Sequence, residues 1–427
     1  MTRAGRKDLR PGGCAARGRK GGDGSIVSGG RIAVLTGAAL VAVSPAAARA
    51  QAQEAPRDGF ELGGQVQVIY DSNLLRLRDD LPAPPGRSRD DLVTSPSAVL
   101  HAQTSPGLQR FALDAQVGRD YHLNNTFLDS SRIAATGVWD GHITPRCDTG
   151  ATARFARAQV DLSEQGLIAA NRRQVFTVLA NARCRVTLGL APLVSYERRE
   201  SANSALVRRS TDFRTSAVSV GVAYNRTGKT GVSLRYLHAR FNYPNRPDLL
   251  SGGGDRVGHD AVEAHGEATL AERINLGLTG RYDWAGADSG RDRFHGFTGE
   301  VTASVRPIPR FDVSAVAARE IDPAVFVAAD YTVFDRASLG AGYAVSPRTR
   351  FDLAGGVERN RYRGRQLIGL ADIRSFDRLL YVSGSVTYRL LRRADLVLEL
   401  RHDDRITDSA FGTFAGTRAL ASFKLTI

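Results

Sequence analysis

The stretch that decides the fold is residues 60–70, FELGGQVQVIY, which continues into DSNLLR at 71–76. Its apolar and polar side chains alternate, and a period of two is that of a β-strand with one apolar face. Asp71 and Asn73 then favour a turn, and a polar, proline-rich segment runs to residue 91. The first unit of the chain is therefore a half-apolar strand that ends in a long polar connection.

The same unit recurs along the chain, with further alternating runs at 217–224, 274–282, 396–401 and 418–427. Short connections lie at 104–107, 144–150, 181–186, 225–230, 270–274, 306–310, 346–350 and 391–395. Long polar connections alternate with them, for example at 71–91, 122–131, 198–211, 242–260 and 359–375. Eight short and nine long connections predict about eighteen strands, within a range of roughly sixteen to twenty.

A soluble β-sandwich would also show a period of two, and a face of small and charged residues fits either architecture. The alternation of short and long connections, however, is typical of outer-membrane barrels. Aromatic residues mark both strand ends, with Phe111, Tyr224, Phe311, Phe351 and Tyr388 at one and Tyr282 and Trp284 at the other. Two aromatic girdles are expected at the two membrane interfaces.

The sequence thus predicts an all-β, transmembrane, antiparallel up-and-down β-barrel with short periplasmic turns and long extracellular loops. The second strand is the weakest prediction, because Pro96 cannot donate a hydrogen bond to its ladder.

The N-terminus has the order of a secretory signal peptide. Basic residues precede the apolar run 32–43, IAVLTGAALVAV, and SPAAARA follows it. Twelve apolar residues are too few for the ~20 that a membrane-spanning helix needs, which disfavours a transmembrane anchor. We expect residues 1–50 to be the signal peptide, 51–57 a short periplasmic segment and 58–427 the barrel, located in the outer membrane.

The chain is basic, with a formal net charge of +14, and about half of that charge lies in residues 1–50. For an exported protein an anionic surface or solute is the expected partner, and no nucleic acid is expected. The sequence contains no HExxH, Walker, GxSxG or CxxC motif. We therefore expect no enzyme, no cofactor and no metal. An outer-membrane lipid hydrolase with a Ser–His pair is a less favoured alternative, because none of the eight His lies in a recognisable motif.

Alternation places five arginines on the inward face: Arg154, Arg235, Arg281, Arg389 and Arg401. They are the candidate path for an acidic polymer, because a guanidinium presents a planar fork of donors to carboxylates. In the alternative interpretation they pair with inward acids, such as Glu263, and stiffen the barrel.

Two further groups of residues allow more than one interpretation. His265 between Glu263 and Glu267 has a spacing that can bind a metal, although such a trio in a polar lumen usually does not. Cys147 and Cys184 lie in or beside neighbouring short turns, so the oxidising periplasm permits either a disulfide or two free thiols.

Three stretches carry a resemblance to a family: YDSNLLR at 70–76, residues 121–140 and residues 401–427. Together they resemble the β-barrel porins associated with exopolysaccharide operons, the EpsL-like barrels. One departure is Ile427, where barrels of this class usually end in Phe. The resemblance implies a conduit for an exported, anionic polysaccharide. It also implies contact with outer-membrane lipid and with periplasmic or inner-membrane export components. The alternatives are a general diffusion porin and a structural barrel.

Overall fold

The computed structural model describes residues 58–162, 168–186, 189–224, 230–247, 254–271, 273–287, 293–324, 329–364, 375–408 and 412–427. The signal-peptide and periplasmic-segment predictions, 1–50 and 51–57, lie outside them. The strands are β1 Gly59–Asp71, β2 Asp91–Thr104, β3 Gln109–His122, β4 Ser130–Thr144, β5 Cys147–Gln159, β6 Arg172–Cys184, β7 Leu190–Asn203, β8 Phe213–Tyr224 and β9 Thr230–Pro247. They continue with β10 Gly254–Leu270, β11 Ile274–Ala287, β12 Phe294–Ile308, β13 Phe311–Pro323, β14 Tyr331–Ser346, β15 Thr349–Arg363, β16 Phe376–Leu391, β17 Ala394–Thr407 and β18 Phe414–Thr426.

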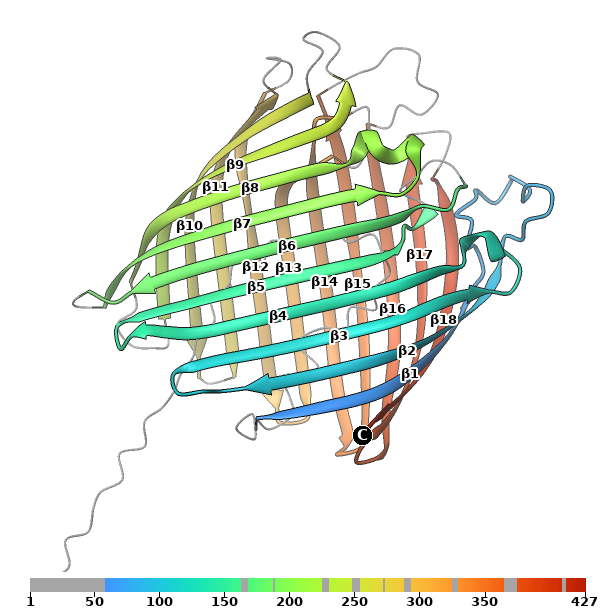
Figure 1. Ribbon diagram of the computed structural model, residues 1–427, viewed down its shortest axis with the longest axis horizontal. Helices are drawn as coiled ribbons and strands as arrows, with labels where there is room; N and C mark the ends of the chain where they lie inside the picture. Colours follow the sequence, from blue (N-terminus) through green and yellow to red (C-terminus); the bar gives the residue numbers. More distant parts are fainter. Residues whose placement is uncertain are drawn as a thin grey trace, which may run out of the picture. The chain divides into compact units, whose positions relative to one another are not determined.

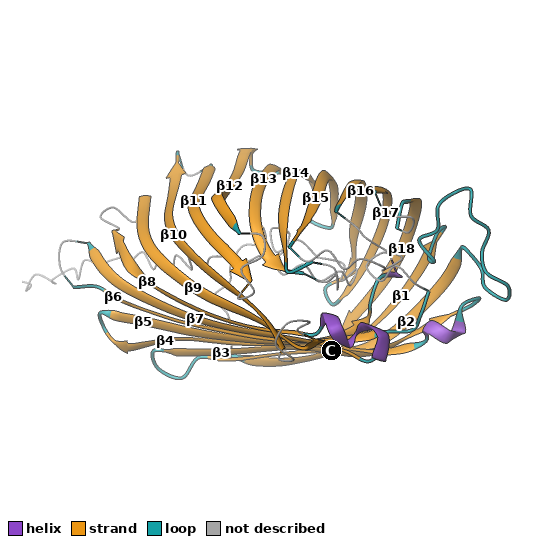
Figure 2. Ribbon diagram, turned by 90° about the horizontal axis from the view of Figure 1, so that it is seen from above, coloured by secondary structure: helices purple, strands orange, loops and turns teal. Residues whose placement is uncertain are grey.

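These strands form one 18-stranded sheet in which each pairs antiparallel with the next along the chain (Figure 1). The first and last strands close it, since Gly63 pairs with Thr426 and Asp71 with Arg418. In Figure 2, the strands follow one another in chain order around the wall of the barrel. The predicted eighteen-stranded antiparallel barrel is therefore confirmed. Two 3-10 helices, η1 Thr126–Leu128 and η3 Leu206–Thr211, lie in long connections. No helix of the described part is long and apolar enough to cross a membrane.

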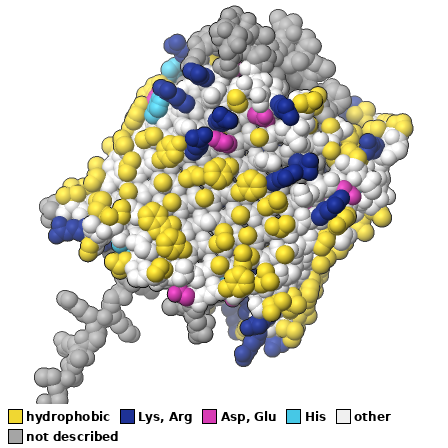
Figure 3. Space-filling model, in the orientation of Figure 1, with side chains coloured by type: hydrophobic (Ala, Val, Ile, Leu, Met, Phe, Trp, Pro, Cys, Tyr) yellow, Lys and Arg dark blue, Asp and Glu magenta, His cyan; other side chains and the backbone are white. Residues whose placement is uncertain are grey.

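The outer face of the barrel is apolar around the middle of the strands. On β8, Val218, Val220 and Val222 are 45–51% exposed, whereas the adjacent Ala217 and Ser219 on the opposite face are buried. Register extends this outer row, because Val220 lies opposite Tyr236 and Tyr236 lies opposite Val262. Hydrophobic side chains are spread over the face shown in Figure 3. Exposure of this surface to water would be unfavourable, whereas in a bilayer it meets lipid chains and the closed sheet leaves no open edge strand.

Four strands are longer than expected. Residues 198–211, 242–260 and 359–375 were each expected to be a long loop, but β7 continues to Asn203, β9 to Pro247 and β15 to Arg363, and β10 begins at Gly254. Eighteen residues of β9 rise about 59 Å at ~3.3 Å per residue, more than a tilted strand needs to cross ~30 Å of hydrocarbon. The polar residues of this segment thus continue the ladder beyond the apolar band.

Pro96 lies within β2, as the alternation indicates, and has Val66 as its partner on β1. On the other side, the β2–β3 ladder passes from the pair Thr94–Tyr121 to the pair Ser97–Gly118. The missing pairs are those of Ser95 and Pro96, and Pro96 has no N–H to donate. The strand therefore persists with a local gap on one side.

Candidate functional site in the barrel interior

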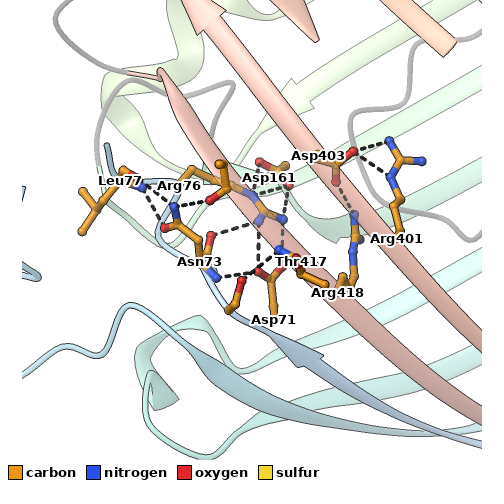
Figure 4. Close-up of polar contacts among 11 residues, drawn as sticks. Asp71, Asn73, Arg76, Leu77, Asp161, Arg401, Asp403, Thr417 and Arg418 are labelled. Carbon is orange, nitrogen blue, oxygen red and sulfur yellow. Dashed lines mark hydrogen bonds and ion pairs between the residues drawn. The ribbon is translucent and has the colours of Figure 1, made fainter. Parts of the chain in front are cut away.

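The opening motif, residues 71–77, folds into the mouth of the barrel at the end that carries the long connections. Asp71 accepts a hydrogen bond from the backbone N–H of Asn73 at 3.0 Å. The buried Asn73 side chain donates to the carbonyls of Leu77 at 2.7 Å and Ala415 at 2.9 Å, and accepts from the N–H of Leu77. These bonds join the motif to β18 across the closing seam of the sheet (Figure 4).

Arg76 is the centre of this motif. Its guanidinium contacts Asp71 at 2.9 Å and Asp161 at 3.2 Å, and lies over the ring of Phe414 with 5.1 Å to the centroid. Burial opposes its charge, but Asp161 and Asp71 outweigh that effect and raise the pKa of Arg76 above its ordinary value. Asp161 belongs to the connection after β5, so this ion pair links two long connections that are far apart in sequence. We call Asp71, Asn73, Arg76 and Asp161 the mouth latch.

Apolar side chains support the mouth latch from the same connections. Leu75, Leu128 and Leu162 are buried against one another, from the connections after β1, β3 and β5. Partly buried neighbours pack on them: Leu74, Leu77, Ala83, Phe127 and Ile168. A loop with its own apolar cluster holds one conformation better than a solvated loop does.

A second element narrows the interior, the tip of the β13–β14 hairpin. The β12–β13 ladder ends at the pair Gly299–Arg319, although both strands continue. Beyond it, Tyr331 and Val333 are 1% and 3% exposed, whereas Leu339 on the same face of β14 is 59% exposed. The outer face of the tip therefore turns inward at the split between β12 and β13.

The tip packs against the inner wall of β8–β11. Its Ile321, Tyr331 and Val333 form one buried cluster with wall residues that include Phe241 and Val257. The remaining wall residues of the cluster are Phe213, Ala217, Ala239, Tyr243, Ala285 and Ala287.

Two residues of the extended part of β9 hold the tip by its backbone. The hydroxyl of Tyr243 donates to the carbonyl of Asp330 and accepts from the N–H of Ala324, both at 2.8 Å. Arg246 donates to the carbonyl of Ala329 at 2.7 Å.

The predicted inward arginines contact inward acids. Arg235 and Arg281 lie on either side of Glu263, with N–O distances of 2.5 and 3.4 Å. Arg401 contacts Asp403 at 2.8 Å and lies over the ring of Tyr381.

The other two predicted arginines are more accessible. Arg389 lies 3.5 Å from Asp395 near a short turn. Arg154 is exposed on β5 and has no carboxylate within ion-pair distance among the described residues. The structure therefore places the five in one interior without aligning them as a track of free positive charge.

The other sequence candidates also have local partners. The ring of His265 contacts the hydroxyl of Thr279 at 2.9 Å, while Glu263 is engaged by the arginines. In the described part of the chain, no group of three His, Cys, Asp or Glu is placed to hold a metal ion. Cys147 and Cys184 are direct partners on β5 and β6, with Cα atoms 4.0 Å apart, and their sulfurs are bonded.

Sequence reasoning missed a recess in the interior wall near the short-turn end. It has a volume of about 290 Å³ and lies on β1–β4 and β18. Its polar lining includes Glu61, Gln65, His101, Gln116, Thr136 and Lys424. The inward parity of each strand could have identified these side chains, but only the closure of β1 on β18 brings Lys424 beside Gln65.

Only part of the mouth latch could be recognised in the sequence. Asp71 and Asn73 were recognised as turn residues, whereas Arg76 and Asp161 were not singled out. The hairpin tip had no sequence signal, because Ile321, Val333 and Tyr331 read as ordinary lipid-facing residues.

Comparison with known proteins finds likeness only among solved structures. No family model matches the chain, and no curated protein matches it. OccK2 (OpdF) of Pseudomonas aeruginosa is 11% identical, with a TM-score of 0.46 over 86% of this chain and 98% of its own. OpdK of the same organism is 13% identical, with a TM-score of 0.44 over 86% and 99%. The siderophore receptor PirA of Acinetobacter baumannii is 8% identical, with a TM-score of 0.42 over 87% and 81%.

The chain has the fold of a closed, 18-stranded antiparallel β-barrel with an apolar outer band. That statement rests on its own register, on its closed sheet and on the apolar outer band. The identities are too low to carry a substrate from these proteins to this one.

Proposed function

We propose that the protein is an outer-membrane channel through which an exopolysaccharide leaves the cell. The observation that carries the proposal is the interior of the closed barrel. Amide, hydroxyl and charged groups line it, and its recess of about 290 Å³ has room for a sugar residue at the short-turn end. Glu61, Gln65 and Gln116 are the kinds of group that hydrogen-bond sugar hydroxyls. The resemblance of residues 70–76, 121–140 and 401–427 to exopolysaccharide-associated porins supports the same substrate class.

The ion pairs in the interior affect how strongly an acidic polymer would bind to the inward arginines. Arg235 and Arg281 already share Glu263, so a polymer carboxylate must compete with a buried partner. Arg154 and Lys424 have no ion-pair partner among the described residues and are the cations available for contact. We therefore propose weak, repeated contacts that let a polymer pass, with little selectivity for anions. We also propose that the chain is a conduit without catalytic activity, with outer-membrane lipid and periplasmic export components as its partners.

The proposal is tested by polymer flux from liposomes that contain the refolded chain. Fluorescent neutral and acidic polysaccharides of equal length are enclosed, and their release is followed. Release of both polymers, faster than from empty liposomes, is the expected result. A matched pair of variants, Lys424→Gln and Lys424→Arg, assigns the contact: Gln slows the acidic polymer selectively and Arg restores it. Retention of both polymers by liposomes that leak small ions would contradict polysaccharide passage.

A general diffusion porin is the second candidate, and the inward-folded tip of β13–β14 favours it. Together with the mouth latch, the tip narrows the end of the barrel that a polymer must leave. If neither element moves, only small solutes pass. Release of mono- and disaccharides with full retention of polymers would select this candidate.

A further inference from the structure

Four arginines gather on the outer face of β7–β10, toward the long-connection end. They are Arg198, Arg214, Arg240 and Arg256, which we call the arginine patch. Each is exposed and shares its strand face with the outward apolar residues of the same strand. The face shown in Figure 3 carries dark-blue side chains toward its upper part, above much of its hydrophobic surface.

The register brings these arginines together. Arg214 on β8 and Arg256 on β10 both lie opposite Asn242 of β9, one on each side. Arg240 lies two residues before Asn242 on the same face of β9. Since neighbouring strands are about 4.8 Å apart and diagonal neighbours about 7–8 Å, the Cβ atoms of these three residues lie within roughly 10 Å.

The patch has little negative charge of its own. Arg198 pairs with Glu200 at 2.5 Å. No ion pair of Arg214, Arg240 or Arg256 is found among the described residues. The nearest outward acid below the patch, Asp260, is already engaged by the hydroxyl of Tyr236 and the ring of His238. Within the described ranges, these three guanidinium groups make no hydrogen bond or ion pair, and Glu200, the ladder partner of Arg214, is engaged by Arg198.

The position of the arginine patch along the strands indicates which layer of the membrane it contacts. One row nearer the middle of the strands lie Tyr196, Val218 and Trp284, which are 38–45% exposed on the same outer face. Aromatic residues of this kind occupy the membrane interface. Arg198 and Arg240 lie one row further along, and Arg214 and Arg256 lie two rows further. The patch therefore lies at the level of lipid headgroups, on the leaflet that faces the long connections.

We propose that the arginine patch is a binding site for the phosphate groups of the glycolipid in the outer leaflet of the outer membrane. Guanidinium groups bind phosphate through bidentate, charge-assisted hydrogen bonds, and several on adjacent strands can hold the closely spaced phosphates of one headgroup. The site rests on the proposed location of the barrel in the outer membrane. It adds a specific lipid partner and gives a role to the outward arginines of the patch.

The test compares two triple variants of the full barrel in detergent. The first removes the patch, Arg214→Gln, Arg240→Gln and Arg256→Gln. The second removes three exposed arginines at the short-turn end: Arg146→Gln, Arg348→Gln and Arg393→Gln. Both lose the same charge. Binding of purified bis-phosphorylated lipid A, and of the same lipid stripped of phosphate, is measured by native mass spectrometry or by titration.

Three cations near a charged headgroup are worth on the order of a hundredfold in affinity. The patch variant should lose about that much affinity for the phosphorylated lipid, and the short-turn variant should bind like the wild type. Equal losses in both variants, or no loss in either, would overturn the proposal.

The wild-type protein supplies a test that needs no variant. It should prefer the phosphorylated lipid over the stripped one by a similar factor, and equal affinity for the two would also overturn the proposal. A barrel that conducts in a bilayer but lacks this preference refutes the lipid site alone. A barrel that does not insert refutes the proposed function.

Discussion

Replacement of Arg76 by alanine tests whether the mouth latch holds the first long connection in place. The side chains of Arg76 and Asp71 are only 6% and 4% exposed, so the variant leaves a buried carboxylate without its cation. Breaking a buried ion pair by removing one partner costs about 3–5 kcal/mol. The side chain of Asp161 is 23% exposed, so water can solvate it in the variant. The free-energy cost of losing Arg76 is therefore near the lower end of that range, about 3 kcal/mol.

If this free energy is lost from the equilibrium between the closed and locally open states of residues 71–77, the population of the open state rises roughly a hundredfold. The assay is hydrogen exchange of backbone amides that the latch protects. The N–H of Leu77 donates to Asn73, and the N–H of Thr417 donates to the hydroxyl of Ser72. Both should exchange about a hundredfold faster in Arg76→Ala, whereas amides of the central β1 ladder should not change.

Arg78 is the matched control, two residues further along the same connection. It pairs with Asp80 on the surface, and this hydrogen bond lowers the pKa of the exposed Asp80 carboxylate below its ordinary value. Solvent screens such a pair, so Arg78→Ala should leave the exchange of Leu77 and Thr417 unchanged. Equal protection in wild type and Arg76→Ala, or equal acceleration in Arg78→Ala, would refute the reasoning.

Four further predictions follow from particular contacts. Gly299→Ala should destabilise the barrel by a few kcal/mol, because a Cβ there would lie 2.2 Å from the carbonyl of Thr279. Its register partner Gly280 has open space at that position, so Gly280→Ala should fold like the wild type in urea titrations monitored by tryptophan fluorescence. Tyr243→Phe removes a hydroxyl that makes two bonds to the β13–β14 tip, at a cost of about 1–3 kcal/mol, and should raise single-channel conductance. Tyr236→Phe, on the outer face, should not change the conductance. Arg235→Gln with Arg281→Gln frees the charge of Glu263 and should shift the reversal potential toward cations. Adding Glu263→Gln should reverse that shift, and an unchanged potential in the double variant would contradict the pairing. Unfolded protein should react with a maleimide at Cys147 and Cys184 only after reduction, and labelling without reductant would contradict the bond between them.

The barrel itself could be predicted because its two signals are local. A period of two identifies each strand, as at 217–224, and the alternation of short and long connections fixes the order of antiparallel neighbours. Closure of the sheet could also be predicted. An open sheet of eighteen such strands would expose two unpaired edge strands, which a membrane does not tolerate. Even the weak point at Pro96 was expected, because a missing N–H is a property of the residue alone.

The interior could be predicted only in part, because it depends on contacts between distant segments. Alternation placed Arg235 and Arg281 inward, but only register shows that both meet Glu263. The β13–β14 tip follows the alternation of a lipid-facing strand, and its inward turn arises where its ladder with β12 ends. Arg76 likewise meets Asp161 through two connections whose conformations no periodicity describes.

Conductance of the refolded chain in a planar bilayer, measured with polysaccharide added to one side, tests the central claim most directly. We expect discrete channels of weak ion selectivity that the polymer blocks transiently, with longer blocks for polymers that reach the recess of Gln65 and Gln116. Absence of channels in a barrel that has folded and inserted would contradict the proposed channel function.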